Sequence, residues 1–164
     1  MENLKRRFRG IRTRGLSLVE LMVTIAVLAI LATIAAPSFL SMIRQYQLTS
    51  TANEVLGLVQ YARSEAVKRA VNITVDIAGE DGSWSAVVTD GTSDFRVFTA
   101  SGRVSATPTP GSVVFDYLGR KDPLTPAASF AFVHESDGTL SRVLIVESSG
   151  RSCVVKSGAD CSPD

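Results

Sequence analysis

The stretch GLSLVELMVTIAVLAILATIAAPSFLSMI, residues 15–43, decides the fold of this 164-residue chain. Glu20 is its only charged residue, and the 23 residues from Leu21 to Ile43 carry no charge. At a rise of about 1.5 Å per residue, such a run crosses the roughly 30 Å hydrocarbon core of a bilayer as one helix. It is too long for the apolar core of an ordinary secretory signal peptide. The stretch therefore predicts a membrane-spanning helix near the N-terminus.

The residues before this run form a basic leader. Residues 1–15 contain six basic side chains against Glu2, whereas the remaining 149 residues hold 15 acidic and 11 basic side chains. By the positive-inside rule, the N-terminus lies in the cytoplasm and the rest of the chain outside it. The acidic body argues against a broad nucleic-acid-binding face, because neutralising phosphates requires clustered Lys and Arg.

The helical pattern continues beyond the apolar run. Pro37 lies inside the run, and a helix-interior proline is expected to kink or loosen the helix. After it, apolar residues recur at spacings of four and three, which is the pattern of one stripe on an amphipathic helix. The stripe consists of Leu48, Ala52, Val55, Val59, Ala62 and Ala66. We expect one long helix over residues 17–69, with its first half in lipid and its second half packed on a folded head.

From residue 71 the hydrophobic period changes to two, which predicts strands. The expected strands cover residues 71–77, 83–89, 95–99, 112–117, 128–134, 139–147 and 151–156. Residues 107–111 and 122–126 are rich in Pro and Thr and are expected to be loops. Antiparallel strands packed on one face of a long helix place the chain in the α+β class.

The two cysteines, Cys153 and Cys161, lie eight positions apart near the C-terminus. In an exported chain a disulfide closing this short loop is the natural interpretation, and two unpaired thiols are the alternative. A metal site is not expected, because the single His134 and two cysteines do not fill a tetrahedral shell. No phosphate-binding loop, catalytic triad or spaced carboxylate pair is visible. We therefore expect neither an enzyme nor a cofactor.

Glu20 is an unusual residue for a plain membrane anchor. A carboxylate within hydrocarbon is costly, and intramembrane acids are by default functional and have a partner. If a protease cut the chain after Gly15, Leu16 would gain a positive α-amino group that Glu20 could neutralise, within one subunit or between staggered subunits. The alternative is an acid that snorkels to the cytoplasmic interface, which leaves Gly15 and the basic leader unexplained.

The junction Arg14-Gly15-Leu16-Ser17-Leu18-Val19-Glu20 resembles the type III signal of type IV pilins and type II secretion pseudopilins. The resemblance implies that prepilin peptidase cleaves after Gly15 and N-methylates Leu16, which stands where phenylalanine is usual. It also implies that Glu20 governs methylation and docking into the filament. Pro37 stands where pilins often carry a helix-loosening proline.

The same resemblance implies that the chain is divided into three segments. Residues 1–15 are a removable leader, residues 16–43 are the transmembrane and assembly half of the helix, and residues 44–164 are the extracytoplasmic head. The protein would be a single-pass protein of the cell inner membrane with a periplasmic head, and would later enter a filament. Its partners would be prepilin peptidase, other major and minor pilins or pseudopilins, and the inner-membrane assembly platform.

A second resemblance covers the head. The segments Tyr61–Arg69, Val114–Arg120 and Ile145–Cys153 are similar to those of GspH/FimT-type minor pilins. This implies a subunit that primes or caps a type IV pilus or a type II secretion pseudopilus, two roles that the sequence does not separate. Arg63 and Glu65 are two positions apart and do not face each other on a helix, so no local pair accounts for them. A solvated helix face is the alternative for these charges.

A role in DNA uptake is the alternative function. Some FimT-like pilins bind DNA during natural transformation through a C-terminal Gly-Arg-x-Arg segment. The corresponding stretch is Gly150-Arg151-Ser152-Cys153, in which Cys153 replaces the second arginine. Arg142, Arg151 and Lys156 are the candidate DNA contacts, and scattered surface charges on a sheet are the other interpretation.

Overall fold

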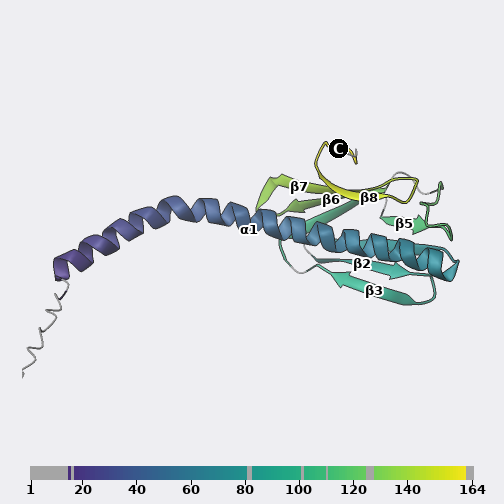
Figure 1. Cartoon of the computed structure of the whole chain (residues 1–164), viewed down its shortest axis with the longest axis horizontal. Coiled ribbons are helices and arrows are strands. Elements are labelled where there is room, and N and C mark those ends of the chain that lie inside the picture. Colours follow the sequence, from purple (N-terminus) through teal and green to yellow (C-terminus); the bar gives the residue numbers. More distant parts are fainter. Residues whose placement is uncertain are drawn as a thin grey trace, which may run out of the picture. The chain divides into compact units, whose positions relative to one another are not determined.

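The computed structural model describes residues 15, 17–80, 83–100, 102–109, 111–124 and 128–161. The chain divides into two compact units, Met1–Leu40 and Ser41–Asp164, and each is described here by itself. Helix α1 (Leu18–Arg69) belongs to both units (Figure 1). The helix predicted over residues 17–69 is confirmed to within one residue at its start.

In the first unit, the described part of α1 has no buried side chain. Every described residue from Ser17 to Leu40 is exposed, including Leu18 at 74% and Ile34 at 72% of their full accessible surface. By length and composition α1 suffices to cross a membrane. Pro37 lies within the helix, which is assigned as helical on both sides of it. The expected kink or loosening at Pro37 stays a prediction.

In the second unit, α1 is amphipathic and its apolar stripe is buried. The six predicted stripe residues are each at most 1% exposed, and they belong to the same core cluster as the strands. Leu58 and Glu65 are also buried. Because three of the six are alanines, the helix backbone can lie close to the strands that it covers.

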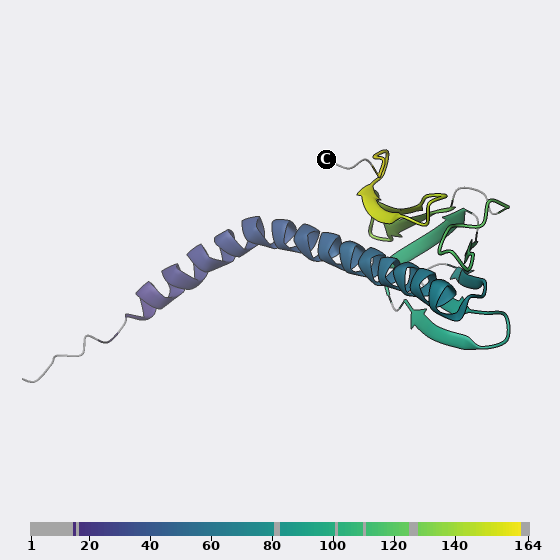
Figure 2. The same cartoon turned by 45° about the vertical axis from the view of Figure 1, so that its right-hand side comes forward.

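Within the described residues, eight strands follow the helix. They are β1 (Ile73–Glu80), β2 (Ser83–Thr89), β3 (Asp94–Thr99), β4 (Val104–Thr109), β5 (Ser112–Phe115), β6 (Ala128–His134), β7 (Asp137–Val146) and β8 (Ser152–Lys156). They form two four-stranded antiparallel sheets, in the orders β3-β2-β1-β5 and β4-β6-β7-β8. Figures 1 and 2 show β2 and β3 of the first sheet on one side of the second half of α1, and β7 and β8 of the second sheet on the other. The α+β class is confirmed.

Alternation along the strands sets which face is buried. Ile73, Val75 and Ile77 of β1 are buried, while Thr74 and Asp76 between them are more accessible. The same period of two buries Trp84, Ala86 and Val88 in β2 and Phe130 and Phe132 in β6. Because successive strand side chains point to opposite faces, this pattern turns one face of each sheet toward the core.

Strand β4 corrects the loop predicted over residues 107–111. Residues Thr107 to Thr109 belong to β4, and Pro108 pairs in register with Phe130 of β6. Proline lacks the N–H that an interior strand donates to both neighbours, so its composition indicated a loop. β4 is an edge strand, where the proline nitrogen can face away from the only neighbour.

Two buried polar groups connect parts of the head. The indole N–H of Trp84 donates to the Val104 carbonyl over 2.8 Å, and its ring lies 5.6 Å from that of Phe132, so β2 of the first sheet contacts β4 and β6 of the second. His134 is fully buried, accepts the Ser136 N–H at Nδ1, and has Nε2 3.2 Å from Gln47 Oε1 of α1. His134 therefore holds the end of β6 against the helix.

The close approach of helix and sheets gives a prediction for Ala62, which is fully buried in the stripe. We expect Ala62→Leu to lower the free energy of unfolding by about 1–3 kcal/mol, because added methylenes overpack a filled interior. Ser64→Leu, on the exposed face of the same helix turn, should change it by no more than about 0.5 kcal/mol. Urea unfolding of the full chain in detergent, followed by near-ultraviolet circular dichroism, measures both. Equal losses would contradict the assigned faces.

Candidate functional site

The predicted processing and assembly residues of the described chain are Gly15, Glu20 and Pro37. Gly15 is exposed, and nothing lies within 4 Å of where its Cβ would be. Glu20 lies in the first turn of α1, where a negative charge is favourable at a helix N-terminus. The predicted leader residues 1–14 and Leu16 lie outside the described residues. A bond from Glu20 to the Leu16 amine therefore remains a prediction.

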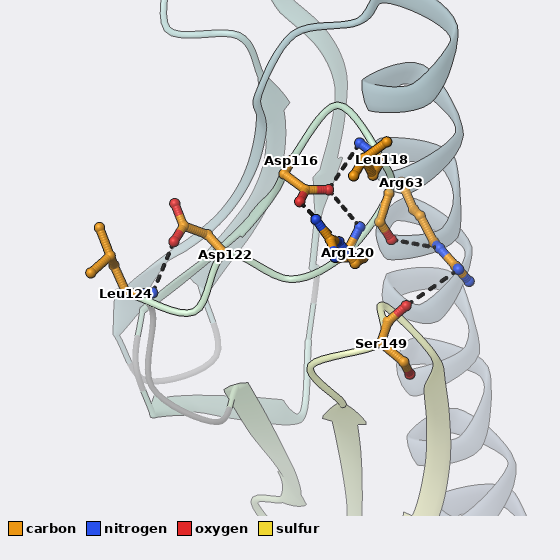
Figure 3. A network of polar contacts seen from close by, with 8 residues as sticks. Arg63, Asp116, Leu118, Arg120, Asp122, Leu124 and Ser149 are labelled. Atoms are coloured by element: carbon orange, nitrogen blue, oxygen red, sulfur yellow. Dashed lines mark hydrogen bonds and ion pairs between the residues drawn. The ribbon is translucent and has the colours of Figure 1, made fainter.

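A second candidate site lies in the head, where Arg63 of α1 contacts two turns. Its Nε donates to the Gly119 carbonyl over 2.8 Å, and its Nη2 donates to the Ser149 carbonyl over 3.4 Å (Figure 3). The first turn follows β5 and the second joins β7 to β8. Arg63 thus connects the helix to one turn from each sheet.

Asp116 organises the first turn. Its Oδ1 accepts the backbone N–H groups of Leu118 and Arg120 over 2.9 and 2.8 Å, and its Oδ2 lies 3.3 Å from Arg120 Nε. The hydrogen bond from the Arg120 N–H is the main reason why the pKa of Asp116 lies below its ordinary value. The carboxylate therefore stays charged and keeps the Gly119 carbonyl turned to Arg63.

The second turn, residues 147–151, is closed in a similar way. Glu147 and Arg151 pair through their backbones over 2.8 Å and through their side chains over 3.2 Å. The Lys121 N–H donates to the Ser148 carbonyl over 3.2 Å, which joins this turn to the first. Each turn is thus fixed by its own acid–arginine pair and then held against the other.

Two glycines allow the turns to touch. Gly119 and Gly150 have φ values of 73° and 79°, in the left-handed region that favours glycine. A Cβ on Gly119 would lie 2.8 Å from Val67 Cγ2, and one on Gly150 would collide with the Gly119 carbonyl oxygen. Both glycines are therefore required by space as well as by backbone conformation.

Glu65 and Arg69 attach the end of the helix to β3. Glu65 is 6% exposed and lies 2.6 Å from Arg69 Nε and 3.4 Å from Lys68 Nζ. The Arg69 hydrogen bond is the main cause that holds the pKa of Glu65 below its ordinary value. Arg69 also lies 4.1 Å above the Phe95 ring. The expectation that no local pair accounts for Glu65 was wrong, because its partners are three and four residues further along the helix.

The three candidate DNA contacts do not form one patch. Arg142 of β7 and Lys156 of β8 are directly paired in register, so two like charges lie side by side. Arg151 precedes the opposite end of β8, next to the Val146–Ser152 end of the ladder. There its guanidinium pairs with Glu147. The structure therefore brings two of the three cations together and separates the third.

The predicted disulfide between Cys153 and Cys161 is confirmed, with their Cα atoms 6.0 Å apart. It links β8 to the segment that follows it. In the part of the chain that the structure describes, no three His, Cys, Asp or Glu side chains are placed to hold a metal ion.

The sequence did not predict the two hydrogen bonds that Arg63 makes to distant turns. Its two acceptors are 56 and 86 residues away along the chain, so no local pattern reveals them. A signal was nevertheless present. Gly119 and Gly150 each precede an arginine in the two later segments that resemble minor pilins. Arg63 lies in the first of the three segments with this resemblance, residues 61–69. The fold brings Arg63, Gly119 and Gly150 together.

Comparisons with known proteins match a family model and a sequence motif to this chain. The family model of the type II transport protein GspH matches residues 51–150, which include Arg63 and both glycines. The prokaryotic N-terminal methylation motif matches residues 11–36. None of the curated proteins matches the chain.

Crystal structures of the type IV minor pilin FimU from Pseudomonas aeruginosa PAO1 have a similar fold. The form in space group P21 is 24% identical, with a TM-score of 0.58, and the match covers 70% of this chain and 92% of that one. The form in space group P65 is 25% identical, with a TM-score of 0.56, and covers 68% and 95%.

The contact between the two turns gives a prediction with an internal control. Gly150 and Gly158 have similar positive φ values, 79° and 84°, but only Gly158 has open space around its Cβ position. Gly158→Ala should cost only the left-handed strain, about 1–2 kcal/mol. Gly150→Ala should cost roughly 1–3 kcal/mol more, because backbone atoms must move. Urea unfolding midpoints of the full chain in detergent measure the difference, and equal midpoints would refute the contact.

Proposed function

The chain belongs to the type II transport protein GspH family, and we propose that it is a minor subunit that primes or caps a type IV pilus or a type II secretion pseudopilus. It is made as a precursor in the inner membrane, cleaved after Gly15, and then extracted into the filament. Its role is assembly, with no catalytic step of its own.

The exposed apolar half of α1 carries this proposal. Its large apolar side chains are exposed among the described residues of their unit, Leu18 by 74% and Ile34 by 72%. Leaving a single Leu, Ile or Val in water instead of burying it forgoes about 1.5–3 kcal/mol. A segment with this surface must be covered by lipid or by other helices, and the same segment serves both states in turn.

Processing at Gly15 connects the two states. The basic leader keeps the N-terminus in the cytoplasm, where prepilin peptidase would remove it and methylate Leu16. The match of residues 11–36 to an N-terminal methylation motif supports this step. The disulfide supports a periplasmic head, because disulfides persist in oxidising compartments.

Glu20 gives the assembled state its register. Lipid tails are as apolar as leucine, so moving the helix from bilayer to filament is nearly neutral in hydrophobic terms. Side-chain packing and polar pairs must then determine the position of each subunit along the filament. In the proposed filament, Glu20 of one subunit neutralises the α-amino group of Leu16 of its neighbour.

DNA binding is the second candidate, and the Arg142–Lys156 pair is the observation in its favour. The pairing of Arg151 with Glu147 weighs against it, because it leaves two adjacent cations for phosphate neutralisation. A gel-shift titration of the full chain in detergent with duplex DNA separates the two functions. A shift that Arg142→Ala and Lys156→Ala both weaken would favour the DNA-binding role.

Processing is tested by Gly15→Val. We expect this variant to accumulate as the full precursor, because a β-branched side chain obstructs a site fitted to a residue without Cβ. Gly10→Val makes the same change within the leader but away from the junction, and it should be cleaved normally. Mass spectrometry of membrane-extracted protein reports the N-terminus of each. A Gly15→Val protein that begins at Leu16 would disprove the assignment.

Glu20→Leu separates an assembly signal from a passive anchor. If Glu20 only tolerated lipid, the change would remove a burial penalty of up to roughly 2.5–3.5 kcal/mol and leave assembly intact. If Glu20 pairs with an amine, the change leaves that amine unpaired, at a cost of about 3–5 kcal/mol. We therefore expect a cleaved, membrane-inserted protein that enters sheared filaments poorly and is less methylated.

Thr24→Leu is the matched control, because it removes a polar group one turn further along without removing a charge. The Thr24 hydroxyl already bonds to the Leu21 carbonyl of its own helix. The readout is the amount of each variant in sheared filaments divided by its membrane pool. Incorporation of Glu20→Leu at the wild-type level would leave Glu20 without the proposed role.

A further inference from the structure

Among the described residues, no acidic side chain forms an ion pair with Arg63. Both of its hydrogen bonds go to neutral backbone carbonyls, those of Gly119 and Ser149. A guanidinium has five N–H groups, so those of Nη1 stay available to another acceptor. The side chain is therefore held in position by two hydrogen bonds, and its positive charge has no acidic partner among the described residues.

This guanidinium lines a pocket of about 620 Å³. The pocket, called the Arg63 pocket below, is formed by Gln60, Arg63, Ser64, Val67, Gly150, Arg151 and Ser152. One wall is the exposed side of α1 and the other is the start of β8. The Ser152 hydroxyl and the Gln60 amide of its lining can donate further hydrogen bonds to an anion, whereas the Ser64 hydroxyl already donates to the Tyr61 carbonyl over 2.7 Å.

The charge of the Arg63 pocket suits a single anion. Arg151 is neutralised by Glu147 over 3.2 Å, which leaves Arg63 as the one unbalanced charge in the lining. A nucleic-acid backbone presents many phosphates and requires several unbalanced cations. One fixed guanidinium instead suits one carboxylate, to which Nη1 can donate a charge-assisted hydrogen bond.

Apolar side chains lie beside the pocket. Val67 lines it and is 54% exposed, and Leu118, next to Arg63 in Figure 3, is 52% exposed. Tyr117 of the same turn is 56% exposed. Exposed apolar residues grouped beside a charged pocket mark an interaction site more often than single ones do. The surface thus combines one cation with an apolar edge.

We infer that the Arg63 pocket receives an aspartate or glutamate side chain, flanked by an apolar residue, from another pilin subunit. Charge complementarity identifies the carboxylate, and the Val67–Leu118 edge identifies its apolar neighbour. The inference rests on the proposed function, since it names the contact by which the head recognises a filament partner.

Cross-linking in cells tests it with the full chain. The photo-cross-linking residue p-benzoylphenylalanine replaces Leu118, cells that make filaments are irradiated, and the adducts in sheared filaments are identified by mass spectrometry. We expect adducts with another pilin subunit, at a peptide that contains Asp or Glu within a few residues of the attachment point.

A pair of variants at Gln60 then tests the carboxylate. Gln60→Glu places an acid three residues before Arg63 on the helix, where it can occupy the guanidinium from within the chain. Gln60→Met has a similar size but no charge. The first should lower the adduct yield about tenfold more than the second, because Gln60→Met removes one neutral donor of the lining, whereas Gln60→Glu also costs the partner its charged hydrogen bond to Arg63. Wild-type unfolding midpoints for both exclude a folding defect.

Three results would overturn the inference. They are equal adduct yields for the two Gln60 variants, adducts with DNA in place of a pilin, and no adduct from a chain that is present in filaments. These results leave the proposed function intact. Absence of the wild-type chain from filaments would instead overturn the proposed function, and the inference with it.

Discussion

The burial of the apolar stripe of α1 is the interaction on which the head depends. Both sheets turn their inward faces toward one core, and the stripe belongs to that core together with residues such as Phe115 and Leu144. Small residues at Ala52, Ala62 and Ala66 let the helix approach the strands closely. Arg63 and the Glu65–Arg69 pair, which lie near the end of the helix, then attach the surrounding turns and β3.

The same helix satisfies a different requirement in its first half. There the apolar residues surround the axis, so no single face is set apart for a partner within the chain. One continuous helix thus buries an apolar stripe in its second half and leaves its apolar residues exposed in its first half. This difference between the two halves explains why the charged residues of the helix lie beyond Ile43, with Glu20 as the exception.

Local patterns predicted much of this structure. The 3.6-residue period located the stripe, and the period of two located most strands, because both depend only on near neighbours. The division into two sheets was not predictable, since β1 pairs with β5 across a long stretch that includes β2, β3 and β4. In β4, Pro108 hid a strand that only its edge position permits. The contacts of Arg63 depend on turns 56 and 86 residues away.

The edge position of Pro108 also limits how the head can self-associate. A free sheet edge is a template on which a foreign strand can add through backbone hydrogen bonds. Proline offers no N–H at its position, so the β4 edge presents an interrupted row of donors. The second sheet therefore carries, on its β4 edge, a local barrier to uncontrolled growth by strand addition.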